Sequence, residues 1–294
     1  MNAPRRSTAT ICATLTLAMA WSLPGCKSGP DRRGDRMVER GPAPAYAEAA
    51  ARFNEVAAAY DHLWTPVALR VRYRDASSGK MAEDLLDGHF QAIAPDRVAL
   101  RIDKLSETYA YLGCDSDRYW WIDVKAGSAI VGTHAKATPA ALADFDIPVH
   151  PLDLIALLGI VPVDPTGYGA TRWSTDGRSL GILTRARFGN RLLWVDPKTY
   201  EPNAVEITDE NGRTTLRSTI TRPERIPIDG DRDSRARIAT QYDVKFNDSD
   251  FALGVRLQGP ENRRERMRPA AFNMDTVLRT YRVKDIIDVD ASNP

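Results

Sequence analysis

The stretch that decides the fold is "VALRVRYR", residues 67–74, in which large apolar side chains stand at every second position with Ala68 and three arginines between them. Val67, Leu69, Val71 and Tyr73 fall on one face, and the arginines fall on the other. A period of two residues is typical of a β-strand with one buried face. This stretch therefore predicts a strand that forms one wall of an apolar interior.

Similar segments recur at intervals of about ten residues, separated by Gly, Pro, Asp and Asn turn signals. They are "RVALRID" (97–103), "ETYAYLG" (107–113), "RYWWIDV" (118–124), "SAIVGTH" (128–134), "RSLGILTRARF" (178–188), "RLLWVDP" (191–197), "NAVEITD" (203–209), "TTLRSTITR" (214–222), "ARIATQYDVKF" (236–246) and "FALGVRL" (251–257). Parallel βαβ units would need long helical crossovers, which this spacing does not leave room for. The body is therefore predicted to be mainly β, one antiparallel sheet of about 11 strands.

Two helical regions interrupt this pattern. Apolar residues at three- and four-residue spacing predict an N-terminal helix from Tyr46 to about Leu63. A short helical insertion is predicted around 138–160, containing "PAALADF" (139–145) and "PLDLIALLG" (151–159). The second of these is apolar nearly all round, so it must be buried or must cover an apolar surface.

The N-terminus reads as an export signal. Two arginines at positions 5 and 6 precede an apolar run, residues 9–23, that fits the h-region of a secretory signal peptide. The following "LPGC", Leu23 to Cys26, resembles the bacterial lipobox, in which the signal is cut before a cysteine that is then lipidated. The alternative is an ordinary signal peptide, or a loose membrane anchor, with a chance cysteine.

These features predict three parts. Residues 1–25 form the signal peptide, 26–45 a flexible, lipidated tether rich in charge, Gly and Pro, and 46–294 the folded domain. Lipidation at Cys26 would attach the domain firmly to the membrane of the cell envelope. Position 27 holds Lys rather than the Asp that retains enteric lipoproteins in the inner membrane, which indicates the outer membrane, facing the periplasm.

Charge and cysteine content exclude several classes of protein. Forty Lys and Arg against 39 Asp and Glu give a net charge of +1, which does not support binding to nucleic acid. Of three cysteines, Cys12 leaves with the signal and Cys26 is lipidated, so Cys114 has no disulfide partner within the mature chain. We expect Cys114 to be a buried structural thiol; the alternative is a reactive one.

The motifs that resemble catalytic or metal-binding sites are better explained as turns, loops and surface positions. "GRSLG" (177–181) matches G-x-S-x-G around Ser179, but a strand-like segment follows where a nucleophile elbow needs a helix. "DGDRDS" (229–234) begins like a calcium loop and then lacks its Gly and Glu. The four histidines show no zinc spacing, and the arginines of "ENRRERMRP" (261–269) are diluted by Glu. The sequence therefore predicts no enzyme, no metal and no cofactor.

The chain resembles the LolA/LolB superfamily of lipoprotein-sorting and lipid-binding envelope proteins. "LLWVDPKTYEPNAVEITDENGRTTLRSTIT" (192–221) is similar to the family's strand, "D..T..P", strand, turn and strand, and "GCDSDRYWWID" (113–123) to its aromatic strand pair. The resemblance implies a half-open, strongly curved antiparallel barrel whose hydrophobic cavity holds acyl chains under a helical lid.

Together these observations predict a lipid-anchored envelope protein that binds an acyl chain or another hydrophobic ligand, in lipid or lipoprotein trafficking and with an envelope protein as a further partner. The residues leave open whether the apolar set lines a ligand cavity or fills a plain core, in which case the protein would be a structural or assembly lipoprotein. The candidate lining residues are Leu69, Val71, Tyr73, Leu100, Ile102, Tyr119, Trp121, Leu152, Ile155, Leu158 and Trp194.

Overall fold

The computed structural model describes residues 37–75, 77–144, 149–228, 236–247 and 249–292. Cys26, the predicted signal peptide and the 229–234 loop lie outside these residues, so the lipidation and the calcium-like motif remain predictions from the sequence. Residues 37–294 form one compact unit. None of the helices in the described ranges has the length and apolarity needed to cross a bilayer.

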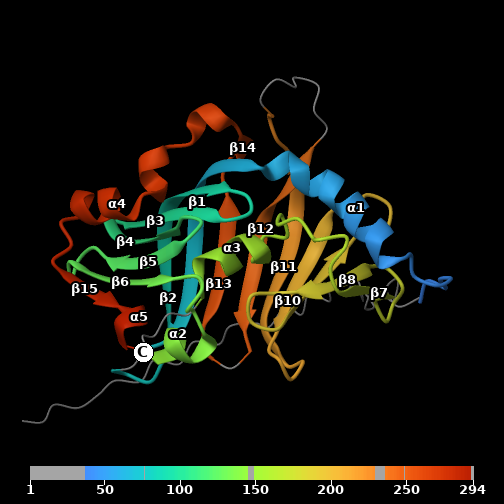
Figure 1. Ribbon diagram of the computed structural model, residues 1–294, viewed down its shortest axis with the longest axis horizontal. Coiled ribbons are helices and arrows are strands. Elements are labelled where there is room, and N and C mark those ends of the chain that lie inside the picture. The colour runs from blue at the N-terminus through green and yellow to red at the C-terminus, as the bar shows by residue number, and fades with distance from the viewer. Residues whose placement is uncertain (1–36, 76, 145–148, 229–235, 248, 293–294) are drawn as a thin grey trace, which may run out of the picture. The chain divides into compact units, whose positions relative to one another are not determined.

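The elements follow the predicted order, with strands dominating (Figure 1). The strands are β1 His62–Arg74, β2 Met81–Ile93, β3 Arg97–Lys104, β4 Glu107–Cys114, β5 Arg118–Asp123, β6 Ser128–Thr133, β7 Gly169–Trp173, β8 Leu180–Arg185, β9 Asn190–Val195, β10 Pro202–Thr208, β11 Thr214–Arg225, β12 Arg237–Phe246, β13 Ala252–Leu257, β14 Glu261–Asn262 and β15 Asp285–Asp288. The helices are α1 Tyr46–Ala57, η1 Ala58–Tyr60, α2 Pro139–Asp144, α3 Pro151–Leu157, η2 Arg264–Arg266, η3 Pro269–Phe272, α4 Met274–Thr280 and α5 Val289–Ser292.

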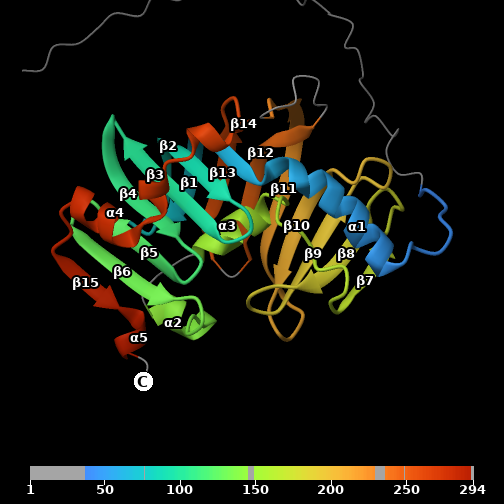
Figure 2. The same ribbon diagram turned by 45° about the horizontal axis from the view of Figure 1, so that its top comes forward.

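All these strands join one sheet, in the order β15-β6-β5-β4-β3-β2-β1-β13-β12-β11-β10-β9-β8-β7, with β14 paired to β1. Neighbours along this order are antiparallel except β15, which pairs with β6 in parallel. The two end strands do not pair with each other, so the sheet is open. It curves around α1 and α3 in both views (Figures 1 and 2). The predicted mainly-β class with a curved antiparallel sheet is confirmed.

The alternation in "VALRVRYR" indicates which side chains of β1 face the concave side of this sheet. Leu69 pairs with Leu86 of β2 and with Val255 of β13, and all three point the same way because paired residues share a face. Arg70 and Arg72 lie on the convex face and are exposed. The concave face holds the main hydrophobic cluster, which α1 and α3 also join.

The α1 helix covers one half of the concave face. Ala49, Ala50, Phe53 and Ala57 form its buried stripe, and the helix contacts β7 and β8. Its polar face contributes too, since the Asn54 side chain bonds the backbone of Val163 in both directions, at 2.7 and 2.8 Å. These bonds fix the chain that leaves α3 against the helix.

The convex face of β3 to β6 carries a second, smaller cluster. Trp120 and Ile122 of β5 are buried there under Phe272, Met274 and Val277, which come from η3 and α4. Tyr119 and Trp121, on the opposite side of the same strand, pack with the main cluster. "RYWWID" is apolar on both faces because both faces are covered, one by the C-terminal segment.

Two details differ from the sequence expectations. The N-terminal helix ends at Ala57 and β1 already begins at His62, so the predicted helix is too long. Fifteen strands are described against about 11 predicted; β2, β7, β14 and β15 were not expected. The residues of β2, "MAEDLLDGHFQAI", lack clean alternation in their first half, where both faces are partly exposed.

The segment just before α1 is anchored to the sheet rather than free. The Val38 N–H donates to the Asp176 carbonyl at 2.9 Å, and Trp173 Nε1 donates to the Gly41 carbonyl at 2.8 Å. The Arg40 guanidinium lies over the Trp173 ring, 4.9 Å from its centroid. The last part of the predicted tether, residues 37–45, is therefore bonded to the sheet, and its first part, 26–36, lies outside the described residues.

Candidate functional site

The concave face keeps a small apolar cavity of about 50 Å³ beneath α3. Strands on both sides of β1 supply its walls, and three leucines of the α3 region supply its cover. The lining residues are Val67, Leu69, Phe90, Leu100, Leu154, Leu157, Leu158, Ser218, Tyr242, Val244, Phe246, Leu253, Val255 and Leu257. Ligand pockets for small molecules usually hold about 300–1,000 Å³. In this state the protein's own side chains therefore fill most of the hollow.

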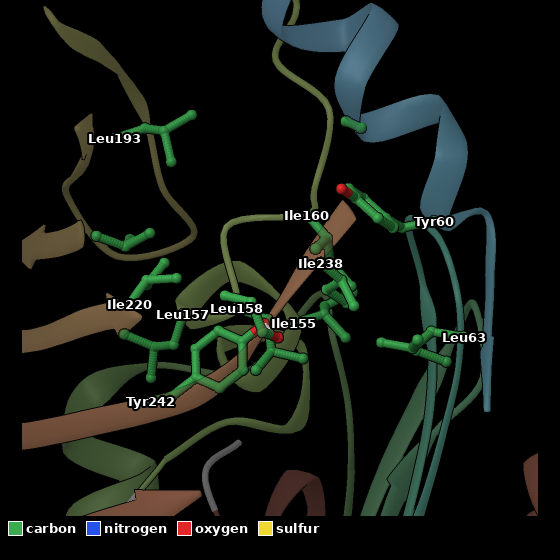
Figure 3. Packing of buried hydrophobic residues seen from close by; sticks show 14 of the residues in the cluster. Tyr60, Leu63, Ile155, Leu157, Leu158, Ile160, Leu193, Ile220, Ile238 and Tyr242 are labelled. Atoms are coloured by element: carbon green, nitrogen blue, oxygen red, sulfur yellow. Dashed lines mark hydrogen bonds between the residues drawn. The ribbon is translucent and has the colours of Figure 1, made fainter. Parts of the chain in front are cut away.

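The cover is the α3 region itself. Leu154, Leu157 and Leu158 face the cavity, and Ile155 is also buried in the main cluster. Figure 3 shows Leu157 and Leu158 pointing toward Tyr242. The helix ends at Leu157, with Leu158 as its C-cap, and Gly159 follows with a φ of +72° that favours glycine; a Cβ there would lie 2.8 Å from the Pro202 side chain. The insertion is thus a short apolar plug seated on the sheet.

One polar group interrupts the apolar lining. Ser218 of β11 is fully buried, and its Oγ has no hydrogen-bond partner among the described residues. The nearby Tyr242 hydroxyl is satisfied, since it donates to the Ala239 carbonyl at 2.7 Å. A buried hydroxyl without a partner costs free energy, so Ser218 is available to a polar group entering the cavity.

A histidine pair ties the start of α3 to the sheet. His150 caps the helix by accepting from the Leu152 N–H through Nδ1 at 3.2 Å, so its Nε2 carries the proton. That Nε2 donates to His134 Nδ1 at 3.3 Å, and His134 Nε2 donates in turn to the Asp115 carbonyl at 2.8 Å. This relay requires both imidazoles to be neutral. Burial lowers the pKa of His150 to about 2 and also lowers the pKa of His134.

The structure separates the predicted lining residues into three groups. Leu69, Leu100 and Leu158 line the apolar cavity. The second group packs in or against the main cluster without lining that cavity: Ile102, Tyr119, Trp121, Leu152 and Ile155. The third group, Val71, Tyr73 and Trp194, belongs to neither.

The residues of the third group lie outside the core for two different reasons. Val71 and Tyr73 lie on the predicted face, but beyond the end of the core, where the Tyr73 hydroxyl donates to Asp84 at 3.1 Å. Trp194 lies on the opposite face from Leu193, under the Arg172 guanidinium, and donates to Glu206 at 3.2 Å. Placing Trp194 in the lining was wrong, because "RLLWVD" is apolar on both faces and gives no sign of which one is concave.

Several lining residues were missed by the sequence analysis. Phe90 lies in β2, which was not predicted because apolar and polar residues do not alternate regularly along it. Ser218 is polar, so an apolar pattern could not identify it. Tyr242, Val244 and the alternate positions of "FALGVRL" were within predicted strands. Period-two alternation, extended to those strands, would have identified them.

The other motifs take ordinary structural places. Ser179 lies in the turn between β7 and β8, is followed by a strand, and accepts from Asn203 at 3.0 Å. Arg263 and Arg266 pair with Glu261, and Arg263 also pairs with Glu265, so part of the charge of the basic run is balanced. Cys114 is fully buried, and burial raises the pKa of its thiol to about 12. Within the described residues, no cluster of three metal-binding side chains occurs.

The arrangement defines a class: a half-open β-sheet whose concave apolar face is covered by a helix and a short helical insertion. No family model matches the sequence, and no curated protein does. Solved structures of this class do match.

Three of them resemble this chain over most of its length. A LolA superfamily protein from Nitrosomonas europaea is 17% identical over 79% of this chain and 99% of its own, with a TM-score of 0.52. A putative outer membrane lipoprotein-sorting protein domain from Vibrio parahaemolyticus is 12% identical over 79% and 97%, with a TM-score of 0.53. A DUF1329 family protein from Desulfovibrio piger is 12% identical over 78% and 96%, with a TM-score of 0.52. The predicted structural likeness to this superfamily is confirmed, at the level of the fold.

Proposed function

We propose that this protein is an envelope lipoprotein that holds an acyl chain on the concave face of its sheet and catalyses no reaction. The observation that carries the proposal is the seating of α3: three leucines of a short insertion occupy an apolar face that continues across six strands. The solved structures of lipoprotein-sorting and LolA superfamily proteins with this fold support the same role. Lipidation at Cys26 would hold the domain at the outer membrane, on its periplasmic side.

Binding requires α3 to move, because the residual cavity of about 50 Å³ is too small for a chain. Uncovering three leucines costs about 5–9 kcal/mol at about 1.5–3 kcal/mol each. A chain that takes their place regains about 0.8 kcal/mol per buried methylene. Roughly 6–11 methylenes are then needed to replace the leucines, so the preferred ligands have long chains.

The test is photo-crosslinking on the full chain, purified from membranes, with a photoactivatable palmitate analogue. Peptides from β1, β12, β13 and the α3 segment should carry the label, and excess palmitate should compete for it. The matched control is Val277→Ala in the second cluster, on the convex face. This variant truncates a side chain that is buried about as deeply as Leu157 and Leu158 on the concave face. Label confined to the convex face, or none at all, would overturn the proposal.

The second candidate is a structural or assembly lipoprotein with a filled core. The small volume of the cavity favours it, since a packed interior needs no ligand. The two candidates differ in what comes with the protein: lipid extracted from the purified, washed protein and identified by mass spectrometry supports the carrier. A stoichiometric protein partner with no extractable lipid beyond the anchor supports the assembly role.

A further inference from the structure

A second cavity lies on the other side of α3 and contains a buried cation. Its volume is about 540 Å³, and its walls include Leu152 and Ala156 of α3, Val161, and Ile207 of β10. Arg191 of β9 also lines it, although only 6% of that residue is exposed. Arg191 sits on the concave face, paired with Thr184 on one side and Ile207 on the other. An arginine at a position that otherwise holds core residues demands an explanation.

Among the described residues, the guanidinium of Arg191 has no counter-ion. Nη2 donates to the Val161 and Pro162 carbonyls at 3.2 and 3.3 Å, while Nε is buried and bonds no acceptor among the described residues. No carboxylate of the described chain lies within ion-pair distance of it. Burial lowers the pKa of Arg191 to about 10, which leaves it charged at neutral pH. A buried charge without a partner is costly.

Thr184, directly across the ladder, adds a second donor. It is buried and lines the same cavity. The Tyr46 hydroxyl gives its one proton to the Asp164 carbonyl at 2.9 Å, so the Thr184 hydroxyl is the donor in its 3.3 Å contact with the Tyr46 oxygen. Because that bond is longer than an ordinary O–H···O bond, the Thr184 hydroxyl can turn from Tyr46 to an anion in the cavity. The two neighbouring strands thus present a guanidinium and a hydroxyl to one space.

The acids that line this cavity do not serve as the missing partner. Burial raises the pKa of Asp153 to about 6, so the group is still mostly ionised at neutral pH, but the cation that acts on it is Arg187 and not Arg191. Asp164 is engaged by the Thr166 hydroxyl and backbone N–H, at 2.8 and 2.9 Å, and these bonds lower its pKa. Both side chains therefore leave the guanidinium to another anion.

We propose that this cavity binds a carboxylate or phosphate group, with Arg191 and Thr184 as its donors. Arginine presents planar, paired donors that suit the oxygens of both groups. The apolar walls from α3 and β10 suit an anion that is the head group of an amphiphile. The inference that the anion belongs to an amphiphile rests on the proposed function of the chain. The inference of an anion site does not.

The experiment measures binding of tritiated oleate and tritiated oleyl alcohol to the full chain in nanodiscs of a zwitterionic phospholipid, with empty nanodiscs as the blank. Inorganic phosphate, followed by calorimetry, forms a third arm that lacks a chain. The variants are Arg191→Gln and the near-isosteric Thr184→Val. Arg172→Gln is the control, because Arg172 is exposed on the opposite face, over Trp194.

We expect oleate to bind at least tenfold more tightly than oleyl alcohol. Arg191→Gln should remove that preference, Thr184→Val should reduce it about threefold, and Arg172→Gln should leave it unchanged. Thermal melts establish that each variant folds; if Arg191→Gln does not, the ratio of the two ligands in Thr184→Val carries the test.

The remaining outcomes separate the two proposals. Equal binding of oleate and oleyl alcohol, insensitive to Arg191, overturns the anion site and leaves the acyl-chain function standing. Phosphate binding that depends on Arg191, without any lipid binding, supports the anion site with a free anion as its ligand and overturns the acyl-chain function. Absence of binding in all three arms overturns both.

Discussion

His150 Nε2 donates to His134 Nδ1 at 3.3 Å, and this bond joins the first residue of the α3 cover to the end of β6. Both rings contact Tyr119: His134 stacks on it with ring centroids 6.0 Å apart, and His150 meets it edge-on with centroids 4.8 Å apart. Arg187 adds a positive charge nearby, donating to the His134 carbonyl at 3.1 Å. Protonating either ring would therefore place a second cation beside Arg187 and break the relay.

The first prediction is a loss of stability in acid. The folded-state pKa of His150 is lowered to about 2, so its contribution is complete above the unfolded value near 6.5 and declines as the pH falls below it. The slope for this residue is at most about 1.4 kcal/mol per pH unit. Asp153, whose pKa is raised to about 6, acts in the opposite direction as it protonates.

His150→Asn isolates the histidine term, because Asn also caps helices and Asp153 is unchanged. Urea unfolding at pH 7 and pH 5 measures the free energy of unfolding of both proteins. The wild type should lose more stability than the variant between these pH values. Equal losses would contradict the relay of two neutral imidazoles.

The second prediction concerns the cover. Leu158→Ala removes one of the three leucines that face the apolar cavity, and should lower the free energy of unfolding by about 2–4 kcal/mol. Because the cover is then easier to displace, palmitate should bind more tightly than to the wild type, and hexanoate should bind to neither. Val277→Ala, in the convex cluster, should lower stability without changing palmitate binding. Equal palmitate affinity for Leu158→Ala and the wild type would speak against an opening α3.

The third prediction concerns Ser218. Its buried Oγ has no hydrogen-bond partner in the part of the chain that the structure describes, so Ser218→Ala should raise the free energy of unfolding of the ligand-free protein by about 1 kcal/mol. Ser179→Ala is the comparison, since its Oγ accepts a bond from Asn203 and its loss should not stabilise the protein. Thermal denaturation after delipidation measures both. Destabilisation by Ser218→Ala would show that the hydroxyl is satisfied.

The fourth prediction concerns Cys114. The thiol is fully buried and its pKa is raised to about 12, so almost no thiolate forms at neutral pH. A thiol-specific aromatic disulfide reagent should leave Cys114 unmodified in the folded protein for hours and modify it within seconds in urea. Rapid modification under native conditions would identify the reactive thiol that the sequence left as an alternative.

The fold was largely predictable because period-two alternation needs no knowledge of neighbours. Leu69 and Val71 are apolar and Arg70 and Arg72 beside them are charged, so the strand and its buried face follow directly. The alternation did not predict β2, because polar residues occupy both faces of its exposed end. It could not orient Trp194, because apolar residues on both faces of β9 leave the concave side undefined.

The candidate site was only partly predictable. Leu69, Leu100 and Leu158 were expected and do line the apolar cavity. The meeting of His134 with His150, and the isolation of Arg191 in a second cavity, follow from strand pairings and from the seating of α3. Side chains that are far apart in the chain and share no spacing rule leave no local signal.

The amino-acid sequence by itself determined the local structure of this protein: which segments become strands, which insertion is too apolar to stay in water, and which cysteine is left without a partner. What only the tertiary structure decided is how much of the concave face α3 fills and which charges it encloses. The physical reason is that backbone periodicity and turn chemistry act over a few residues. Cavity volume and the burial of a charge are instead properties of surfaces that meet only after the whole sheet has curved.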